Sequence, residues 1–276
     1  MSSDFRTNFD AYSRHYGVGW LQKPIAAYLR KFHNQANCTM VPTEQLRRSL
    51  DGQGFERLHV VARGIDTAMF NPAHRDASLR AQWGVGEHDR VVLSVGRLAA
   101  EKNLGLLVDA FQAMRAVDPR LKLVLVGDGP QRAELQQRCP GAWFAGSQTG
   151  QALSRHYASA DVFLFPSLTE TYGNVTPEAL ASGLAVLAFE HAAASELIRS
   201  GHNGLLAPLG DAGAFVRRAV DMAANPALCQ QLAQQARASV ISRDWATIAT
   251  QVESLWARLA RQQERVVVLP AQAQLA

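Results

Sequence analysis

VVLSVGRLAAEKNLGLLVDAFQAMRAVDPRLKLVLVGDGP, residues 91–130, is the stretch of sequence that decides the fold. It contains two short apolar runs, 91–95 and 122–126, which flank a segment with apolar residues at helical spacing from Leu104 onward. Strands that are apolar on both faces and alternate with helices are typical of a parallel sheet covered on two sides. The stretch therefore predicts consecutive elements of an α/β layered domain.

The same alternation of strands and helices continues along the chain. Further apolar runs occur at 142–145, 162–165 and 185–189, and helix-periodic segments begin near Gln131, Gln151, Val175, Ala193 and Ala212. In parallel α/β sheets, ligands bind outside the carboxyl ends of the strands. We therefore expect functional side chains in the loops that directly follow the apolar runs.

Shorter and less regular segments flank this predicted domain. Residues 38–43 and 57–66 predict two strands around a short helix at 44–50, too few for a sheet of their own. They indicate the end of another α/β domain whose beginning is absent. The expected divisions are 1–66 as this remnant, 67–90 as a linker with a short helix, 91–242 as the larger domain, 243–264 as a helix packing back toward the N-terminal part, and 265–276 as a tail.

Length and composition indicate a globular protein. The 276 residues are 47% hydrophobic and 19% charged, and no run approaches the roughly 20 apolar residues that a membrane span needs. Residues 1–20 lack the apolar core of a signal peptide, so a cytoplasmic address is expected. Cys38, Cys139 and Cys229 show no metal-ligand spacing and are expected to be reduced packing residues.

The positive charge is concentrated at the start of the chain. Residues 1–75 hold 10 Lys and Arg against 6 Asp and Glu, whereas residues 76–276 hold 18 of each kind. The basic, aromatic segment 12–34 could contact a nucleic acid or an anionic membrane surface, or pack its aromatic side on a core. Core packing is the favoured interpretation. A weak membrane-surface contact at the inner face stays open, and no nucleic-acid partner is expected.

The loop after the first strand carries two cations. Gly96 lets the backbone turn close to a ligand, and Arg97 and Lys102 then place two positive charges at the carboxyl edge of the sheet. Two cations on one loop suit a diphosphate. The alternative is that both side chains are simply solvated.

The loops after the next two strands contain small residues. Gly127 and Gly129 lie in GDGP, and Gly146 lies in AGSQT. Such glycines allow close backbone approach by a base or ribose, although a tight turn explains them equally well. The GDGP stretch is not the dinucleotide-binding fingerprint, because the third glycine is missing.

The stretch ETYGNVTPEALASG, residues 170–183, follows the fourth strand. Glu170 is predicted on the loop, and a helix is predicted to begin between Gly173 and Thr176, where free backbone N–H groups and the helix dipole would form an anion site. Glu178, a turn inside, could accept hydrogen bonds from a vicinal pair of sugar hydroxyls. This spacing suits a diphosphate between two sugars. The alternative is that Glu178 complements the helix dipole and Glu170 is a solvated acid.

Four stretches together resemble a known family. SVGRLAAEKN, LVGDGP, FLFPSLTETYGNVTPEALASG and GLLAPLGD resemble the donor half of retaining, nucleotide-sugar-dependent glycosyltransferases of the GT-B fold, family 4 or group 1 type. The resemblance covers residues 57 to about 260. It implies a Rossmann-like doubly wound parallel sheet, and SSDFRTNFDAYSRHYG, residues 2–17, resembles the last part of the acceptor domain in members often described as GDP-mannose-dependent.

The resemblance implies a role for each matching residue. Arg97 and Lys102 would bind the donor diphosphate and stabilise its departure, Glu170 would hold the transferred sugar, and Glu178 would hold the ribose. Further donor contacts are implied at Gly96, Gly127, Gly129, Gly146, Tyr172, Gly173, Asn174 and Val175. The donor would be a GDP- or UDP-sugar and the acceptor a lipid or saccharide hydroxyl. No metal or other cofactor is implied.

The sequence departs from the family pattern in two places. The loop EHAAASE has Ala193 and Ala194 where the family often has Gly-Gly, and roughly a hundred residues of the acceptor domain, with its catalytic histidine, are missing. Arg6 and His15 are expected on the surface rather than at the acceptor. We therefore expect a retaining transferase of mannose or glucose that is inactive or weak as this chain. The alternative is a non-catalytic nucleotide-sugar-binding module that needs a partner chain. A sugar-nucleotide epimerase ranks last.

Overall fold

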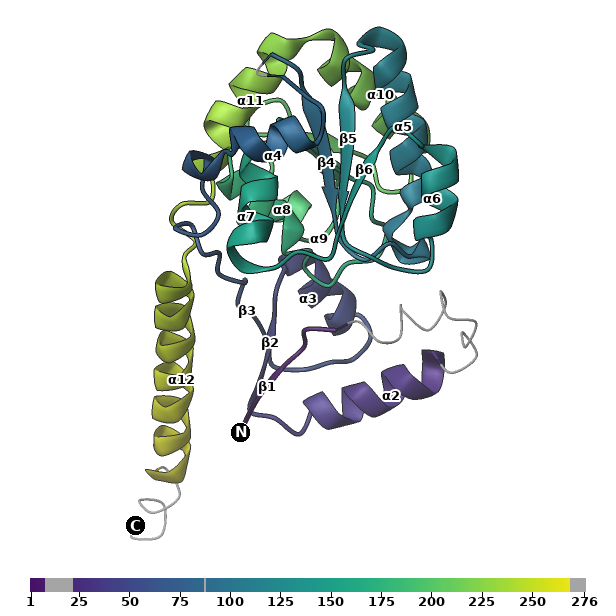
Figure 1. The fold of residues 1–276 in the computed structure, drawn as a ribbon. Helices are drawn as coiled ribbons and strands as arrows, with labels where there is room; N and C mark the ends of the chain where they lie inside the picture. Colours follow the sequence, from purple (N-terminus) through teal and green to yellow (C-terminus); the bar gives the residue numbers. More distant parts are fainter. Residues whose placement is uncertain (8–21, 87, 269–276) are drawn as a thin grey trace, which may run out of the picture.

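The computed structural model describes residues 1–7, 22–86 and 88–268, with side chains through residue 261 (Figure 1). A large sheet covered by helices lies above a smaller sheet, and helix α12 (Trp245–Val268) runs down beside the smaller one (Figure 1). Two parallel sheets of unequal size therefore organise the described part of the chain.

The large sheet contains six strands, all parallel. They are β4 (Val91–Val95), β5 (Lys122–Val126), β6 (Trp143–Gly146), β7 (Val162–Phe165), β8 (Ala185–Phe189) and β9 (Leu205–Ala207). Their order across the sheet is β6-β5-β4-β7-β8-β9. The prediction of a doubly wound parallel α/β sheet is confirmed. The short strand β9 was not predicted.

Helices cover both faces of this sheet and bury both sides of each central strand. They are α5 (Leu104–Val117), α6 (Arg132–Arg138), α7 (Gly150–Ala158), α8 (Val175–Ala181), α9 (Ala192–Leu197), α10 (Ala212–Ala224) and α11 (Pro226–Ala238). In β4, Val91 and Leu93 belong to one core, whereas Val92 belongs to the other. Because successive side chains point to opposite faces, a strand between two layers must be apolar throughout.

The smaller sheet has the order β1-β2-β3, with β1 (Ser2–Asp4), β2 (Cys38–Val41) and β3 (Leu58–Val60) in parallel. Helices α2 (Gln22–His33) and α3 (Glu44–Asp51) accompany it. The prediction that this region has too few strands for its own sheet was wrong, because β1 supplies a third strand. Helix α12 packs Ile248 and Leu255 against this sheet.

Two residues singled out near the N-terminus have different outcomes. Arg6 forms an ion pair with Asp4, with 2.5 Å between Nε and Oδ2. His15, like the first part of the basic segment 12–34, lies outside the described residues. The three cysteines are buried and form no disulfide.

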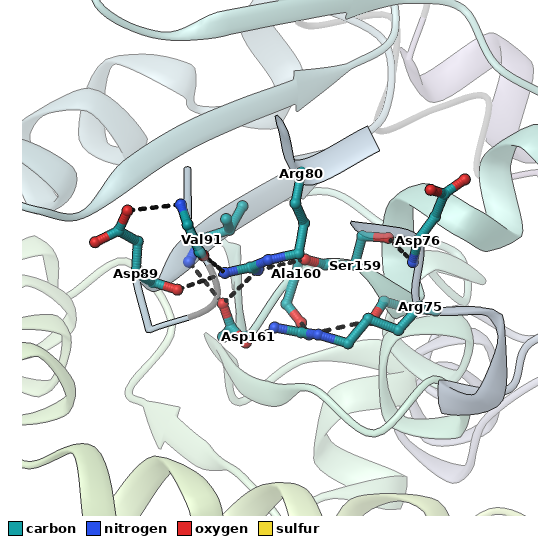
Figure 2. A network of polar contacts seen from close by, with 10 residues as sticks. Arg75, Asp76, Arg80, Asp89, Val91, Ser159, Ala160 and Asp161 are labelled. Carbon is teal, nitrogen blue, oxygen red and sulfur yellow. Dashed lines mark hydrogen bonds and ion pairs between the residues drawn. The ribbon is translucent and has the colours of Figure 1, made fainter. Parts of the chain in front are cut away.

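A polar network fixes the linker to the large sheet (Figure 2). The linker contains the short helices η2 (Pro72–His74) and α4 (Ala77–Gln82). Buried Arg80 donates to the Ser159 carbonyl at 2.8 Å and to Asp161 Oδ2 at 3.2 Å, while Arg75 donates to Asp161 Oδ1 at 2.8 Å. Asp161 directly precedes β7, so the network lies at the amino end of the sheet. The loops that follow the strands lie at the opposite, carboxyl edge of the sheet.

Candidate functional site

The strand order creates a crossover in the middle of the large sheet. The chain moves outward from β4 through β5 to β6, returns to pair β7 with β4, and then continues to β8 and β9. In open α/β sheets, this switch point between oppositely directed connections forms the ligand crevice at the carboxyl edge. The loops 96–103 and 166–174 flank it.

Lys102 and Glu170 come together at this switch point. Lys102 ends the short helix η3 (Ala100–Lys102) after β4, and Glu170 lies in the loop after β7. Their side chains form an ion pair and are 17% and 11% exposed. Ser167 Oγ donates to Glu170 Oε1 at 2.7 Å, and Lys102 Nζ lies 5.6 Å from the centre of the Phe165 ring. A largely buried cation and carboxylate therefore face each other where a ligand is expected.

Arg97 lies on the same loop as Lys102 and is exposed. The loop that carries it is anchored, because the Leu98 amide donates to the Asp128 carbonyl at 2.9 Å. The Leu98 carbonyl in turn accepts from the Gln131 amide at 2.9 Å. Both predicted cations thus project from a loop that is held against the neighbouring one.

Gly127 and Gly129, which were predicted to lie close to a ligand, lie close to the backbone of the loop after β4. A Cβ atom added at Gly127 would lie 1.9 Å from the Gly96 carbonyl oxygen, and one at Gly129 would lie 2.4 Å from the Leu98 oxygen. The loops after β4 and β5 therefore pack backbone against backbone. Gly146, with φ of +69°, accepts a hydrogen bond from the Gly127 amide at 2.8 Å.

The segment 172–176 turns sharply into α8. Gly173 has φ of +83°, and Tyr172 is buried with its hydroxyl donating to the Arg63 carbonyl at 3.4 Å. The Thr176 amide donates to the Gly173 carbonyl at 3.0 Å. The expectation of free amides from Gly173 to Thr176 was therefore wrong for Thr176, because the turn uses that group. Asn174, the residue before the helix, is exposed, and Val175 begins the helix.

Glu178 lies in the first turn of α8 and has a hydrogen-bond partner that sequence reasoning missed. The Tyr157 hydroxyl, at the end of α7, donates to Glu178 Oε2 at 2.9 Å. Burial raises the pKa of Glu178 to about 7, against the opposing effects of the Tyr157 hydrogen bond and the Arg63 charge. No sequence signal marked Tyr157, because it occupies an apolar position of an amphipathic helix.

The loop after β8 links the large sheet to the smaller one. Ala192 has φ of +51°, and its amide donates to Gln45 Oε1 of α3 at 3.0 Å. The Glu44 amide donates to Glu196 Oε1 at 3.0 Å. Ala193 and Ala194, which replace the family's glycines, are buried in α9. The smaller sheet is therefore tied to the ligand edge of the larger one.

His191 precedes α9 and lies beside Glu170. Burial lowers the pKa of its imidazole, while the charge and backbone of Glu170 raise it. Within the described residues its buried Nδ1 has no hydrogen-bond partner. His191 is a second residue near the candidate site that the sequence analysis did not name.

The described part of the chain contains neither a metal-binding cluster nor a membrane-spanning helix. Residues 1–7, 22–86 and 88–268 contain no group of three or more His, Cys, Asp and Glu that could hold a metal ion. Within the same ranges, no helix has the length and apolar character that crossing a bilayer requires.

A separate cavity of about 410 Å³ lies between the linker and α7. Its lining includes Arg75 and Arg155, which pair with Asp161 and Asp76 respectively. In open α/β sheets, ligands bind beside the switch point at the carboxyl edge, and this cavity lies between the linker and α7 instead. The loops at the β4–β7 switch point remain the stronger candidate site.

Comparison with protein families supports the resemblance seen in the sequence. The family model described as glycosyl transferases group 1 matches residues 89–225. The chain is 35% identical over 249 residues to a GDP-mannose-dependent alpha-mannosyltransferase from Mycobacterium tuberculosis, covering 90% of this chain and 64% of the relative. It is 30% identical to a sulfoquinovosyl transferase from Arabidopsis thaliana, covering 91% of this chain and 50% of that one. The chain therefore spans only part of each relative.

Solved structures share the fold. The sucrose-phosphate synthase from Thermosynechococcus elongatus matches with a TM-score of 0.79 at 24% identity, covering 95% of this chain and 68% of that one. Anabaena HepE in complex with UDP and glucose matches with a TM-score of 0.75 at 24% identity, covering 84% and 66%.

Proposed function

We propose that this chain, which matches the family model of group 1 glycosyl transferases over residues 89–225, binds the donor of a retaining glycosyltransferase, a nucleotide diphosphate sugar. The full protein would transfer mannose or glucose to a lipid or saccharide hydroxyl. The observation that carries the proposal is the meeting of Lys102 and Glu170 at the β4–β7 switch point. A paired cation and acid at that edge can separate to hold a phosphate and a sugar hydroxyl.

The proposed roles follow from charge and position. Lys102 and Arg97 would contact the diphosphate, where negative charge grows as the bond to the sugar breaks. Glu170, with the backbone of 172–175, would hold the transferred sugar, and Glu178 would accept from the ribose hydroxyls. The acceptor hydroxyl would attack the anomeric carbon on the face that the diphosphate leaves, which retains its configuration.

The names of the relatives narrow the donor class. One relative is named for its dependence on GDP-mannose, and one fold neighbour was solved with UDP and glucose. We propose a GDP- or UDP-sugar as donor and no metal cofactor, because the two cations of the loop 96–103 can balance the diphosphate charge. Gly96, Gly127, Gly129 and Gly146 would let the nucleotide approach the backbone.

The chain is shorter than its relatives, and this affects the transferase activity expected of it. It spans 64% of the mannosyltransferase relative, and its smaller sheet has three strands in the described residues. We propose that residues 1–66 are part of an acceptor domain, joined by 67–90 to the donor domain at 91–242. Residues 243–264 would return to the first part and 265–276 would be a tail, of which the first residues, to Val268, continue helix α12. The chain alone would then turn over weakly or not at all.

A second candidate function follows from the same partial length. The chain could be a non-catalytic nucleotide-sugar-binding module that a partner chain completes. Lengthening the chain with the upstream coding sequence that the first proposal implies distinguishes the two. Transferase activity that appears only in the lengthened chain supports the first function, whereas activity that needs a separate chain supports the second.

Nucleotide binding tests the donor site directly. We expect GDP or UDP to raise the thermal unfolding temperature more than ADP does. A nucleotide at 100 times its dissociation constant adds about 2.7 kcal/mol to the free energy of unfolding. Differential scanning fluorimetry with the three nucleotides side by side measures this. If none of them shifts the transition, the donor-site proposal is wrong.

We also propose a cytoplasmic protein that touches the inner membrane face through α2. Tyr28 and Phe32 are 69% and 50% exposed one helical turn apart, and Lys23 and Lys31 of the same helix are also exposed. Each basic residue near an anionic surface contributes about 1 kcal/mol. Exchanging both lysines for glutamate should therefore reduce sedimentation with phosphatidylserine vesicles at least tenfold, whereas exposed Arg120→Glu should not. Equal binding to phosphatidylcholine vesicles would contradict the proposal.

A further inference from the structure

Tyr157 is held rigidly inside the large domain. Its side chain is completely buried at the end of α7. The ring makes an edge contact with Phe70 at 5.5 Å and a tilted contact with Phe163 at 5.8 Å between ring centres. Because both neighbours belong to the same packed core, the ring cannot swing without disrupting that core. The direction of its hydroxyl is therefore set by the fold.

That hydroxyl is directed at a single acid. It donates to Glu178 Oε2 at 2.9 Å. A second group also acts on Glu178: the positive charge of Arg63, from the segment that links the two sheets, lowers the pKa of this acid. Among the described residues Tyr157 is the group that donates to this carboxylate, so Oε1 is left for a ligand, and one carboxylate oxygen has two lone pairs. A vicinal pair of hydroxyls could donate to both.

We propose that Tyr157 is a positioning residue for the nucleotide ribose: it holds one oxygen of Glu178 and so directs the other toward the two ribose hydroxyls. This inference rests on the proposed function, because it takes Glu178 as the ribose contact. It adds a role for Tyr157, a buried residue of α7 that does not touch the ligand itself and acts on it through the carboxylate of Glu178 on α8. The same hydrogen bond favours the charged carboxylate, which is the form that accepts from both hydroxyls.

The hydrogen bond therefore also governs how binding depends on pH. Burial raises the pKa of Glu178 to about 7, and the Tyr157 hydroxyl acts against this rise. Burial and the neighbouring carboxylate raise the pKa of Tyr157 well above 10, so the hydroxyl stays protonated and able to donate. Nucleotide affinity should increase as the pH rises through about 7. Without nucleotide, the free energy of unfolding should fall as the pH rises from about 4.5 to about 7. In that range the folded state binds more protons than the unfolded state, because the pKa of Glu178 is higher in the folded state.

Tyr157→Phe tests the proposal while keeping the shape of the core. Isothermal titration calorimetry with GDP or UDP between pH 6 and 9 should show affinity roughly tenfold lower than that of the parent at pH 7, because a hydrogen bond to a charged group is lost. The loss should shrink toward pH 9, and the midpoint of the pH profile should move upward. Glu178→Gln should bind weakly with little pH dependence. Tyr28→Phe, at an exposed tyrosine on α2, should match the parent.

The possible failures are distinguishable. If the parent chain binds no nucleoside diphosphate at any pH, the proposed function itself fails. If the parent binds and Tyr157→Phe keeps both its affinity and its pH midpoint, only the positioning role is overturned. A uniform loss of affinity with an unchanged midpoint would likewise overturn it, because general damage to the core would not move the titration of Glu178.

Discussion

Gly127→Ala is expected to lower the free energy of unfolding by about 4 kcal/mol, from a backbone conformation unsuited to side chains and from a steric clash. Gly127 has φ of +134°, which residues with a Cβ atom rarely adopt. The added carbon would lie 1.9 Å from the Gly96 carbonyl oxygen, so the loops after β4 and β5 would have to separate. Urea denaturation followed by circular dichroism measures the change.

Gly141→Ala is the matched control for this substitution. Gly141 is exposed, its φ is not in the left-handed region, and the nearest atom to an added Cβ is a side-chain nitrogen of Arg115 at 4.0 Å. Its free energy of unfolding should change by less than about 1 kcal/mol. If Gly127→Ala were as stable as Gly141→Ala, the described packing of the two loops would be incorrect.

Lys102→Ala should weaken the binding of GDP or UDP by roughly a hundredfold, since hydrogen bonds to charged groups are strong in a site shielded from water. The side chain is 17% exposed, so solvent screens its charge only in part. Its removal takes away the cation proposed to face the diphosphate. Calorimetric titration gives the affinity, and the thermal transition of the free variant shows whether it still folds.

Glu170→Gln separates the two halves of the Lys102–Glu170 pair. If Glu170 holds the sugar, this variant should bind the nucleoside diphosphate within about threefold of the parent but lose most of the additional affinity for the nucleotide sugar. Lys31→Ala, at an exposed position of α2, should affect neither ligand. Equal losses for both ligands in Glu170→Gln would assign Glu170 to the phosphates instead.

The sequence predicts the large sheet well because its strands carry their own signal. Val91–Val95 is apolar at every position, as a strand buried on both faces must be. The strands that were missed lack such a signal. Ser2–Asp4 is polar and owes its place to tertiary contacts, such as the 2.8 Å hydrogen bond between Ser3 Oγ and Thr39 Oγ1. Leu205–Ala207 is too short to be recognised by its pattern alone.

The sequence predicts which loops form the candidate site, but not which of their side chains are in contact. Strand ends placed Lys102 and Glu170 at one edge, because parallel strands share a direction. That these two side chains pair depends on the lengths of two separate loops. The link from Tyr157 to Glu178 joins two helices, and a tyrosine at an apolar helical position looks like any core residue. Gly127 could be recognised as special, but only the structure shows that another loop is its neighbour.

The pairing of β4 with β7 also has a kinetic consequence. It brings Val92 beside Val162 and Leu93 beside Phe163, across the whole intervening β5–β6 unit. Closing so long a segment of chain is costly in entropy, and contacts of this kind slow folding. No local fragment holds both Lys102 and Glu170 side by side. During refolding, the ability to bind nucleotide should therefore return with this long-range closure and not with the earlier formation of helices.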